Sequence, residues 1–187
     1  MKVLGILSSP RRKGNSEILL DKALEAAESA GLDTERIVLN ELKFVPCQEC
    51  GGCNKTGRCI INDDMQAIYE KIDEASVIII ASPIFFGSLP AQLKAMIDRY
   101  QCRWVEKVVL KEKKDMKVKK KGFLILVSGS NRKRFFKNAE GIVKNFFAVL
   151  DIEFIGSLYC PDIDEKAGIL KKPDYLKQAF KLSRSLL

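Results

Sequence analysis

Short apolar runs alternate with amphipathic segments along most of this chain. Five apolar runs have the length of β-strands, and they lie at residues 3–7, 34–39, 77–81, 123–127 and 154–158. Five further segments carry apolar residues at helical spacing, at about 16–30, 68–72, 90–97, 135–150 and from Pro173 onward. This alternation predicts a doubly wound five-stranded parallel sheet with helices on both faces.

Length and composition favour one domain over residues 1–187. Hydrophobic residues make up 47% of the chain, which is enough to bury a core. No apolar run is long enough to span a membrane, and the first, Val3 to Leu7, is too short for a secretory signal. We therefore expect a cytoplasmic protein without membrane contact. In such a protein, clustered cysteines indicate metal ligands rather than disulfides.

Positive charge is concentrated in one segment of the chain. The net charge is +8, and the eight lysines from Lys107 to Lys121, against Glu112 and Asp115, contribute +6 of it. We expect residues 105–121 to form a lysine-rich connection, either simply solvated or serving as a docking patch for an acidic electron-transfer partner. Interleaved aromatics and arginines are missing, so nucleic-acid binding is not expected.

The chain contains no histidine. Ser-His-Asp and Cys-His catalysis, mixed Cys/His zinc sites and His-ligated haem all need an imidazole and are excluded. Proton chemistry at neutral pH then falls to a cofactor or a perturbed side chain, and we predict no catalytic side chain of the usual kind.

Four cysteines, Cys47, Cys50, Cys53 and Cys59, lie within thirteen residues. This compact spacing suits a cubane iron–sulfur cluster, in which each iron takes one cysteine ligand. Structural zinc more often uses two cysteine pairs set farther apart, or cysteine with histidine. The cysteines that remain, Cys102 and Cys160, are expected to be buried as small hydrophobic residues.

Three loops follow the first, third and fourth predicted strands, and parallel sheets bind ligands at the ends where such loops leave. Residues 8–16 offer hydroxyls, an amide and basic groups before a helix, which suits a phosphate, although Asn15 and Ser16 are also ordinary helix caps. Phe85, Phe86 and Gly87 offer an apolar platform for a planar ring, unless the two aromatic rings pack into the core. Residues 128–131 add small polar groups.

Three motifs carry a family resemblance: S-S-P-R-x-x-G-N-S at 8–16, C-x2-C-x2-C-x5-C at 47–59 and A-S-P-I-F-F-G-S-L-P-A-Q-L-K-A-M-I-D-R at 81–99. With them the chain resembles the flavodoxin-like NAD(P)H-dependent FMN reductases, and within that family the iron–sulfur flavoproteins. The resemblance implies a flavodoxin-like fold with the cysteine-rich loop after the second strand. It implies FMN bound through its phosphate by Ser9, Arg11, Asn15 and Ser16, and through its ring by Pro83, Ile84, Phe85, Phe86, Gly87, Ser128 and Gly129.

The same resemblance implies a [4Fe–4S] cluster on Cys47, Cys50, Cys53 and Cys59, and a homodimer or a dimer of dimers. It suggests a ferredoxin-like or NAD(P)H electron donor and oxygen, peroxide or a quinone as a small-molecule acceptor. Many relatives have a glycine-rich third loop, where this chain has three basic residues at 132–134. Two alternatives stay open: an NAD(P)H-dependent FMN or quinone reductase with a degenerate or zinc-filled cysteine loop, and a non-enzymatic flavin electron carrier or redox sensor.

Overall fold

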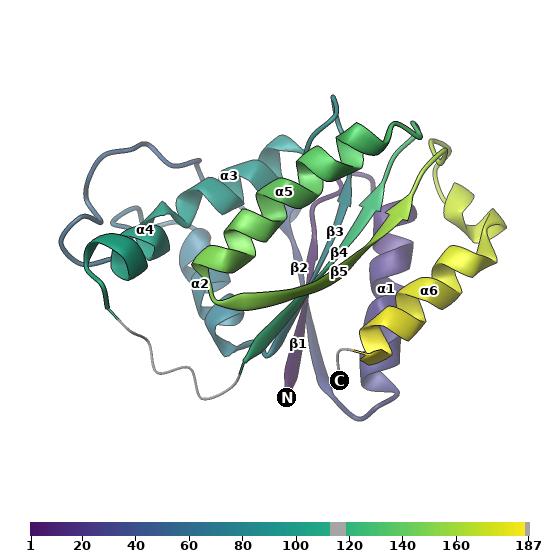
Figure 1. Ribbon diagram of the computed structural model, residues 1–187, viewed down its shortest axis with the longest axis horizontal. Helices are drawn as coiled ribbons and strands as arrows, with labels where there is room; N and C mark the ends of the chain where they lie inside the picture. The colour runs from purple at the N-terminus through teal and green to yellow at the C-terminus, as the bar shows by residue number, and fades with distance from the viewer. Residues whose placement is uncertain (113–118, 186–187) are drawn as a thin grey trace.

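A five-stranded parallel sheet forms the centre of the protein (Figure 1). The structure, a computed structural model, describes residues 1–112 and 119–185. The strands are β1 (Lys2–Leu7), β2 (Asp33–Val38), β3 (Val77–Pro83), β4 (Lys120–Val127) and β5 (Ile152–Cys160). Every pairing between them is parallel, and their order is β2-β1-β3-β4-β5. The predicted doubly wound sheet is confirmed, and its strand order is that of flavodoxin-like proteins.

The helices occupy the segments in which helical spacing was found. They are α1 (Asn15–Glu28), α2 (Met65–Glu74), α3 (Ala91–Arg99), α4 (Gln101–Trp104), α5 (Lys133–Val149) and α6 (Pro173–Ser185). Three shorter helical segments are the 3-10 turns Leu39–Glu41 and Gly168–Lys171 and the π-helical turn Val105–Val109. The helix expected at about 90–97 therefore continues through α4 into the segment that was expected to be a connection.

The sheet separates two apolar layers. In β1, Val3 and Leu7 face α1 and α6, whereas Leu4 and Ile6 face α2, α3 and α5. Figure 1 shows the same division, with α1 and α6 on one side of the sheet. Because β1 and β3 are covered on both faces, their residues are apolar almost throughout, which is why these strands were visible in the sequence.

The lysine-rich connection is shorter than expected among the described residues. β4 begins at Lys120, which pairs with Ile152 of β5. The buried ammonium group of Lys120 donates to the carbonyl oxygens of Ile72 and Asp73, both at 2.6 Å. Three of the eight lysines, Lys113, Lys114 and Lys117, lie outside the described residues.

Hydrogen bonds extend the sheet past the carboxyl ends of its strands. The amide of Ser8 donates to Ala81 O at 3.0 Å, and that of Ile84 donates to Val127 O at 2.8 Å. Ser128 donates in the same way to Cys160 O, at 3.0 Å. The three candidate loops therefore start from one edge of the sheet. That edge includes the point between β1 and β3 where the strand order reverses, and ligands bind there in open α/β sheets.

Candidate functional site

A cavity of about 130 Å3 opens at this carboxyl edge. It is lined by Ser9, Arg11, Asn15, Ser16, Pro83, Ile84, Phe85, Val127, Ser128, Gly129, Ile163, Asp164 and Lys166. All the residues predicted to bind FMN contribute to it except Phe86 and Gly87. The sequence motifs do not identify Val127 and Ile163, whose apolar side chains carry no chemical signal.

The first loop is fastened to the C-terminal part of the chain. Arg11 Nη1 donates to Asp164 O at 3.0 Å, and Asn15 Nδ2 donates to Glu165 O at 2.9 Å. The amide of Ile169 in turn donates to Asn15 Oδ1 at 3.1 Å. The two segments thus meet at one cavity, which both of them line, and Asn15 uses both ends of its amide group to hold them together.

Asn15 and Ser16, the first residues of α1, line this cavity. Gly14 occupies the N-cap position, and no side chain caps the helix. Asn15 and Ser16 are therefore the first helical residues rather than its caps, and both are buried. An uncapped helix start with adjacent hydroxyl and guanidinium groups has the chemistry of a phosphate site.

Phe86 and Gly87 form the tip of a tight turn. Phe85 and Ser88 exchange both backbone hydrogen bonds, at 2.9 and 3.0 Å, and φ is positive at Phe86 (48°) and Gly87 (76°). A Cβ at Gly87 would lie 2.8 Å from the Phe135 ring, so glycine is required there. Phe86 is fully exposed and does not pack into the core, whereas the half-exposed Phe85 lines the cavity.

A second cavity, of about 250 Å3, lies within the cysteine-rich loop. All four clustered cysteines line it, together with Gln48, Glu49, Gly51, Asn54, Ile60, Ile61, Arg99, Gln101 and Cys102. Each of these cysteines is a free thiol, and burial raises the pKa of Cys53. Within the described residues, no group of three or more potential ligands is gathered closely enough to hold a metal ion. The four thiols nevertheless share one cavity, which is the donor set that a cubane cluster requires.

Cys102 also borders the cysteine cavity, which sequence reasoning did not foresee. It is buried, as expected, with 3% of its surface exposed, and its thiol lies 3.4 Å from Arg99 O. Nothing in the local sequence around Cys102 indicates this position, because it depends on how the cysteine loop folds against α3 and α4. Cys160 is buried elsewhere, at the end of β5, where burial raises its pKa to about 12.

The buried side chain of Arg99 joins the two ends of the cysteine loop. Its Nη1 atom donates to Asp63 Oδ2 at 2.6 Å and to Val45 O at 2.8 Å. Its Nη2 atom donates to Asp63 Oδ1 at 3.1 Å and to Ile61 O at 3.3 Å. Val45 precedes the first cysteine and Ile61 follows the last, so this one guanidinium group links the two ends of the loop.

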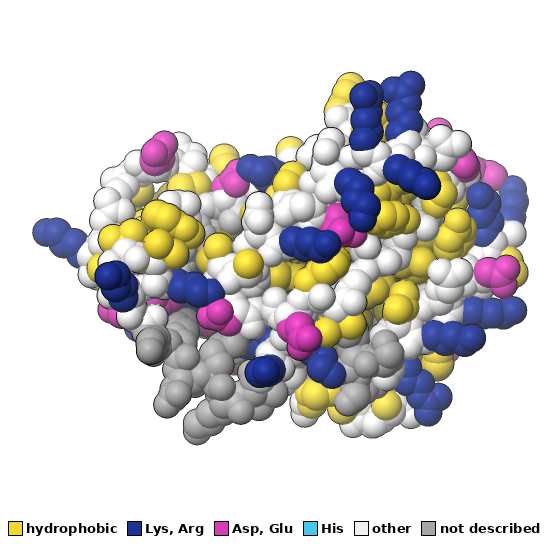
Figure 2. Space-filling view, in the orientation of Figure 1, with side chains coloured by type: hydrophobic (Ala, Val, Ile, Leu, Met, Phe, Trp, Pro, Cys, Tyr) yellow, Lys and Arg dark blue, Asp and Glu magenta, His cyan; other side chains and the backbone are white. Residues whose placement is uncertain are grey.

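A broad groove runs beside the cysteine loop between α3, α4 and α5. Its volume is about 590 Å3, and its lining includes Cys47, Tyr100, Trp104, Ile142 and Phe146. Trp104 is 39% exposed, and Val108 and Val109 nearby are half-exposed. Figure 2 shows hydrophobic side chains gathered at the end of the molecule that carries α4.

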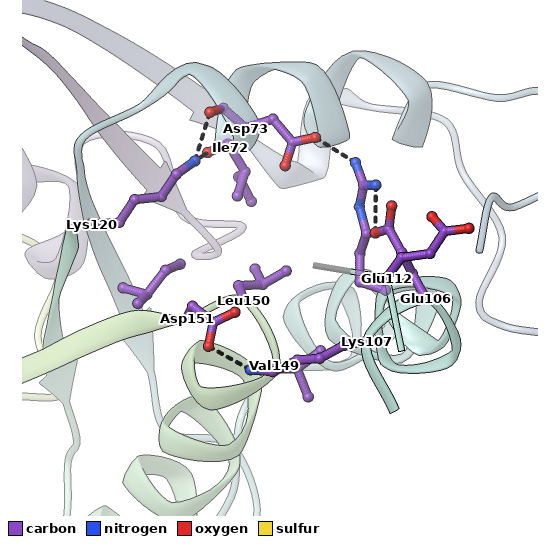
Figure 3. A pocket seen from close by; sticks show the side chains of 11 residues that line it. Ile72, Asp73, Glu106, Lys107, Glu112, Lys120, Val149, Leu150 and Asp151 are labelled. Atoms are coloured by element: carbon purple, nitrogen blue, oxygen red, sulfur yellow. Dashed lines mark hydrogen bonds and ion pairs between the residues drawn. The ribbon is translucent and has the colours of Figure 1, made fainter. Parts of the chain in front are cut away.

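A small polar pocket of about 60 Å3 lies at the opposite, amino-terminal ends of β4 and β5 (Figure 3). Lys120 points from one side towards the end of α2, and Lys107 pairs with Asp151 at 2.6 Å. Arg103 joins Asp73 to the π-helical turn through Glu106. These contacts fasten the turn to α2 and α5, so Lys107 and Lys120 have structural partners.

The strand order and the cavity at the carboxyl ends of the strands are those of the flavodoxin-like class of proteins. More specifically, the chain belongs to the NADPH-dependent FMN reductase family, which its residues 1–157 match. The family predicted from the motifs is therefore confirmed. Among the described residues, none of the helices combines the length and the apolar character needed to cross a membrane.

Several relatives are iron–sulfur flavoproteins. The one from Methanosarcina thermophila is 39% identical over 130 residues, which cover 70% of this chain and 64% of that protein. Another, from Methanocaldococcus jannaschii, is 44% identical over 99 residues, covering 53% of this chain and 51% of that protein. The matches thus span between half and two thirds of the length of these curated relatives.

The fold has close counterparts among solved structures. The NAD(P)H:quinone oxidoreductase from Methanothermobacter marburgensis superposes with a TM-score of 0.74 over 100% of this chain and 99% of its own, at 18% identity. At that identity the comparison establishes the shared fold.

Proposed function

We propose that this chain is a redox enzyme that holds FMN and a [4Fe–4S] cluster. It couples a one-electron donor, such as a ferredoxin, to the flavin-mediated two-electron reduction of oxygen, peroxide or a quinone. The observation that carries this proposal is the presence in one domain of two cavities, one lined by four cysteines and one by nine of the eleven residues expected to bind FMN. When bound, the cluster supplies one-electron transfer and FMN supplies transfer of one or two electrons.

The residues of the first cavity fit the parts of FMN. Ser9, Arg11 and Ser16 offer hydroxyl and guanidinium donors to the phosphate beside the uncapped start of α1. Ile84 and Phe85 offer apolar surface to the ring, with Ser128 and Gly129 on the opposite wall, and we keep Phe86 and Gly87 as ring contacts at the cavity rim. In this role the protein binds and orients the flavin and shields it from water.

The cysteine cavity fits a cluster in its donor chemistry. Cys47, Cys50, Cys53 and Cys59 would each ligate one iron, and Arg99 holds the two ends of the loop at a fixed separation. The free state of all six cysteines suits a reducing compartment, and we place the protein in the cytoplasm.

Self-association would bring the two centres together. The cavities have no lining residue in common within the described part of the chain, so one chain alone separates them. The groove beside Cys47, with the exposed Trp104, is the surface that we assign to a homodimer or a dimer of dimers. A ferredoxin-like donor is favoured over NAD(P)H because the cluster cavity would be redundant if the donor delivered a hydride directly to the flavin.

The composition of anaerobically purified and reconstituted protein tests this proposal. About one FMN, four irons and four acid-labile sulfides per chain are expected, with a broad cluster absorption beside the flavin bands. One zinc per chain without sulfide would overturn the cluster assignment and leave a flavin reductase. Flavin bands without metal would do the same, and NADPH oxidation would then separate a reductase from a passive carrier.

A further inference from the structure

We propose that Arg99 sets the reduction potential of the iron–sulfur cluster, through a hydrogen bond from its Nε–H to a cluster sulfur and through its positive charge. This inference rests on the proposed function, because it needs the cluster to be present. It assigns a specific electronic role to a residue that lies outside the cysteine loop, at the end of α3.

The donors of Arg99 can be counted one by one. A guanidinium group carries five N–H donors and no acceptor. Two donors are used by the forked pair with Asp63, and two more by the carbonyl oxygens of Val45 and Ile61. The fifth, Nε–H, is buried and has no hydrogen-bond partner among the residues that the structure describes.

The position of Arg99 points to the missing partner. Only 1% of its surface is exposed, and it forms part of the wall of the cysteine cavity. A buried charged donor without an acceptor is costly, so such groups nearly always have a partner. The sulfurs of a cluster held by the four cysteines are acceptors that would occupy this cavity.

The positive charge of Arg99 and its proposed hydrogen bond would both raise the reduction potential of the cluster. Asp63, the partner of Arg99, is absent from the cavity lining, whereas Arg99 forms part of it, so the guanidinium is the charged group of this pair that borders the cluster site. Reduction adds one electron, and thus one negative charge, to the cluster. Hydrogen bonds to sulfur and a nearby cation stabilise that state and raise the reduction potential. The proton stays on Arg99 because arginine does not deprotonate in proteins.

Redox titration of the reconstituted holoprotein, followed by EPR, tests the inference. In the double variant Arg99→Gln/Asp63→Asn, which leaves no unpaired buried charge, the ratio of reduced to oxidised cluster at a fixed potential should fall about tenfold. For a one-electron centre this is a downward shift of about 59 mV. Arg99→Lys keeps the charge but loses Nε–H, and should show a smaller shift in the same direction.

Arg103→Lys is the matched control. Arg103 lies on α4, is also largely buried, and directs its guanidinium at Asp73 and Glu106 instead of the cysteine cavity. Its cluster potential should stay at the wild-type value, as should the FMN potential in every variant. Wild-type cluster potentials in both Arg99 variants would overturn the inference while leaving the proposed function intact. A wild-type protein that takes up no iron and sulfide would instead overturn the proposed function.

A measurement on the wild-type protein covers the case in which the variants fail to fold. Pulsed EPR of the reduced cluster in protein labelled with 15N-arginine should reveal a 15N coupling that is absent from unlabelled protein. The coupling should persist in Arg103→Lys. Its absence from the labelled wild type would refute the Nε–H contact.

Discussion

Arg11 Nη1 donates a hydrogen bond to the carbonyl oxygen of Asp164 at 3.0 Å, across 153 positions of the chain. This contact brings the loop after β1 against the segment after β5, at the mouth of the first cavity. It holds an exposed guanidinium beside Ser9 and Ser16 instead of leaving it extended into solvent. The C-terminal segment therefore places the cation that the proposed phosphate site needs.

Arg11→Ala should weaken FMN binding about ten- to a hundredfold and leave the fold intact. The lost charge-assisted hydrogen bonds to phosphate are worth about 1.5–3 kcal/mol. Titration of the apoprotein with FMN, followed by fluorescence quenching, measures the effect.

Arg12→Ala is the control for that experiment. Its guanidinium group faces Glu17 at 3.0 Å and Glu41 at 3.4 Å and does not line the cavity. FMN affinity should therefore stay within about twofold of the wild-type value, since the residue makes no phosphate contact. Equal affinity in wild type and Arg11→Ala would remove the first loop from the phosphate site.

Replacing any one of Cys47, Cys50, Cys53 or Cys59 with Ser should abolish or convert the cluster, because each iron needs its own thiolate. Iron and acid-labile sulfide per chain, after anaerobic reconstitution, measure this loss. FMN should remain bound in these variants because none of the described residues that line the FMN cavity also lines the cysteine cavity. Ferredoxin-linked turnover should disappear, while chemical reduction of the flavin should not.

Cys160→Ser is the distant control, since that thiol is buried at the end of β5. Cys102→Ser is the closer and stricter one, because Cys102 borders the cysteine cavity. Both should keep the wild-type iron content. Iron loss in Cys102→Ser equal to that in the four loop variants would contradict the ligand assignment.

The fold could be predicted from the sequence because its strands are buried on both faces. In β3, every residue from Val77 to Ala81 is buried, so an unbroken apolar run marks it clearly. β4 was placed three residues too late because Lys120 looks like a surface residue. Its backbone pairs with Ile152 of β5 and its ammonium group reaches carbonyl oxygens at the end of α2, and no local pattern reveals either contact.

The first cavity could be predicted where loop chemistry alone defines it. Ser9, Arg11 and Ser16 follow one strand within a stretch of eight residues, so their gathering needs no tertiary information. The wall formed by Ile163 and Asp164 depends on contacts between the two ends of the chain. The sequence likewise could not identify Arg99 as a residue of the cysteine site, because it lies 40 positions after Cys59.

Phe86→Asn should stabilise the flavin-free protein and weaken flavin binding or turnover. Phe86 holds φ at 48° while fully exposed, so the folded state gains little from its ring and is strained at its backbone. Asn followed by Gly is the preferred pair for a turn with two positive φ values. The expected gain is about 1 kcal/mol in the free energy of unfolding.

Urea unfolding of the flavin-free variant, beside FMN titration, separates the two effects. Phe85→Leu, which keeps an apolar side chain at the cavity, is the comparison variant. Greater stability with unchanged flavin affinity and turnover would indicate that the exposed aromatic has no part in the site.

Neutralising Lys111 and Lys119 should slow reduction by an acidic carrier such as a ferredoxin, but not by a small uncharged reductant. Both side chains are exposed, and steering by exposed charge is screened over about 8 Å at physiological salt. The wild-type rate should therefore fall as salt is added, and the variant rate should depend less on salt.

Lys107→Gln tests a different role in the same segment. Its ammonium group already binds Asp151 and Ala148 O, at 2.6 and 2.7 Å, so the change should lower stability more than it lowers the ferredoxin rate. A ferredoxin rate indifferent both to salt and to the Lys111 and Lys119 changes would leave the segment as a simple solvated connection.

Glu140 should make stability depend on pH in the acidic range. Its carboxylate is almost fully buried, which by itself would raise its pKa, but it accepts hydrogen bonds from Lys144, Ser157 and Tyr159. These bonds prevail and lower the pKa to about 2, from an ordinary 4.5. Because the folded-state pKa is the lower one, the stabilisation is complete above about pH 4.5 and is lost as pH falls towards 2.

Glu140→Gln should therefore lower the free energy of unfolding by about 1–3 kcal/mol at pH 7. The difference in unfolding free energy between the variant and the wild type should become smaller as the pH is lowered to about 3. Urea unfolding at several pH values measures both the loss of stability at pH 7 and its change with pH. Glu153→Gln, which changes an exposed carboxylate on β5, should unfold like wild type throughout. A gap between Glu140→Gln and wild type that stays constant from pH 7 to 3 would show that packing, rather than the charged hydrogen bonds joining α5 to β5, accounts for the loss.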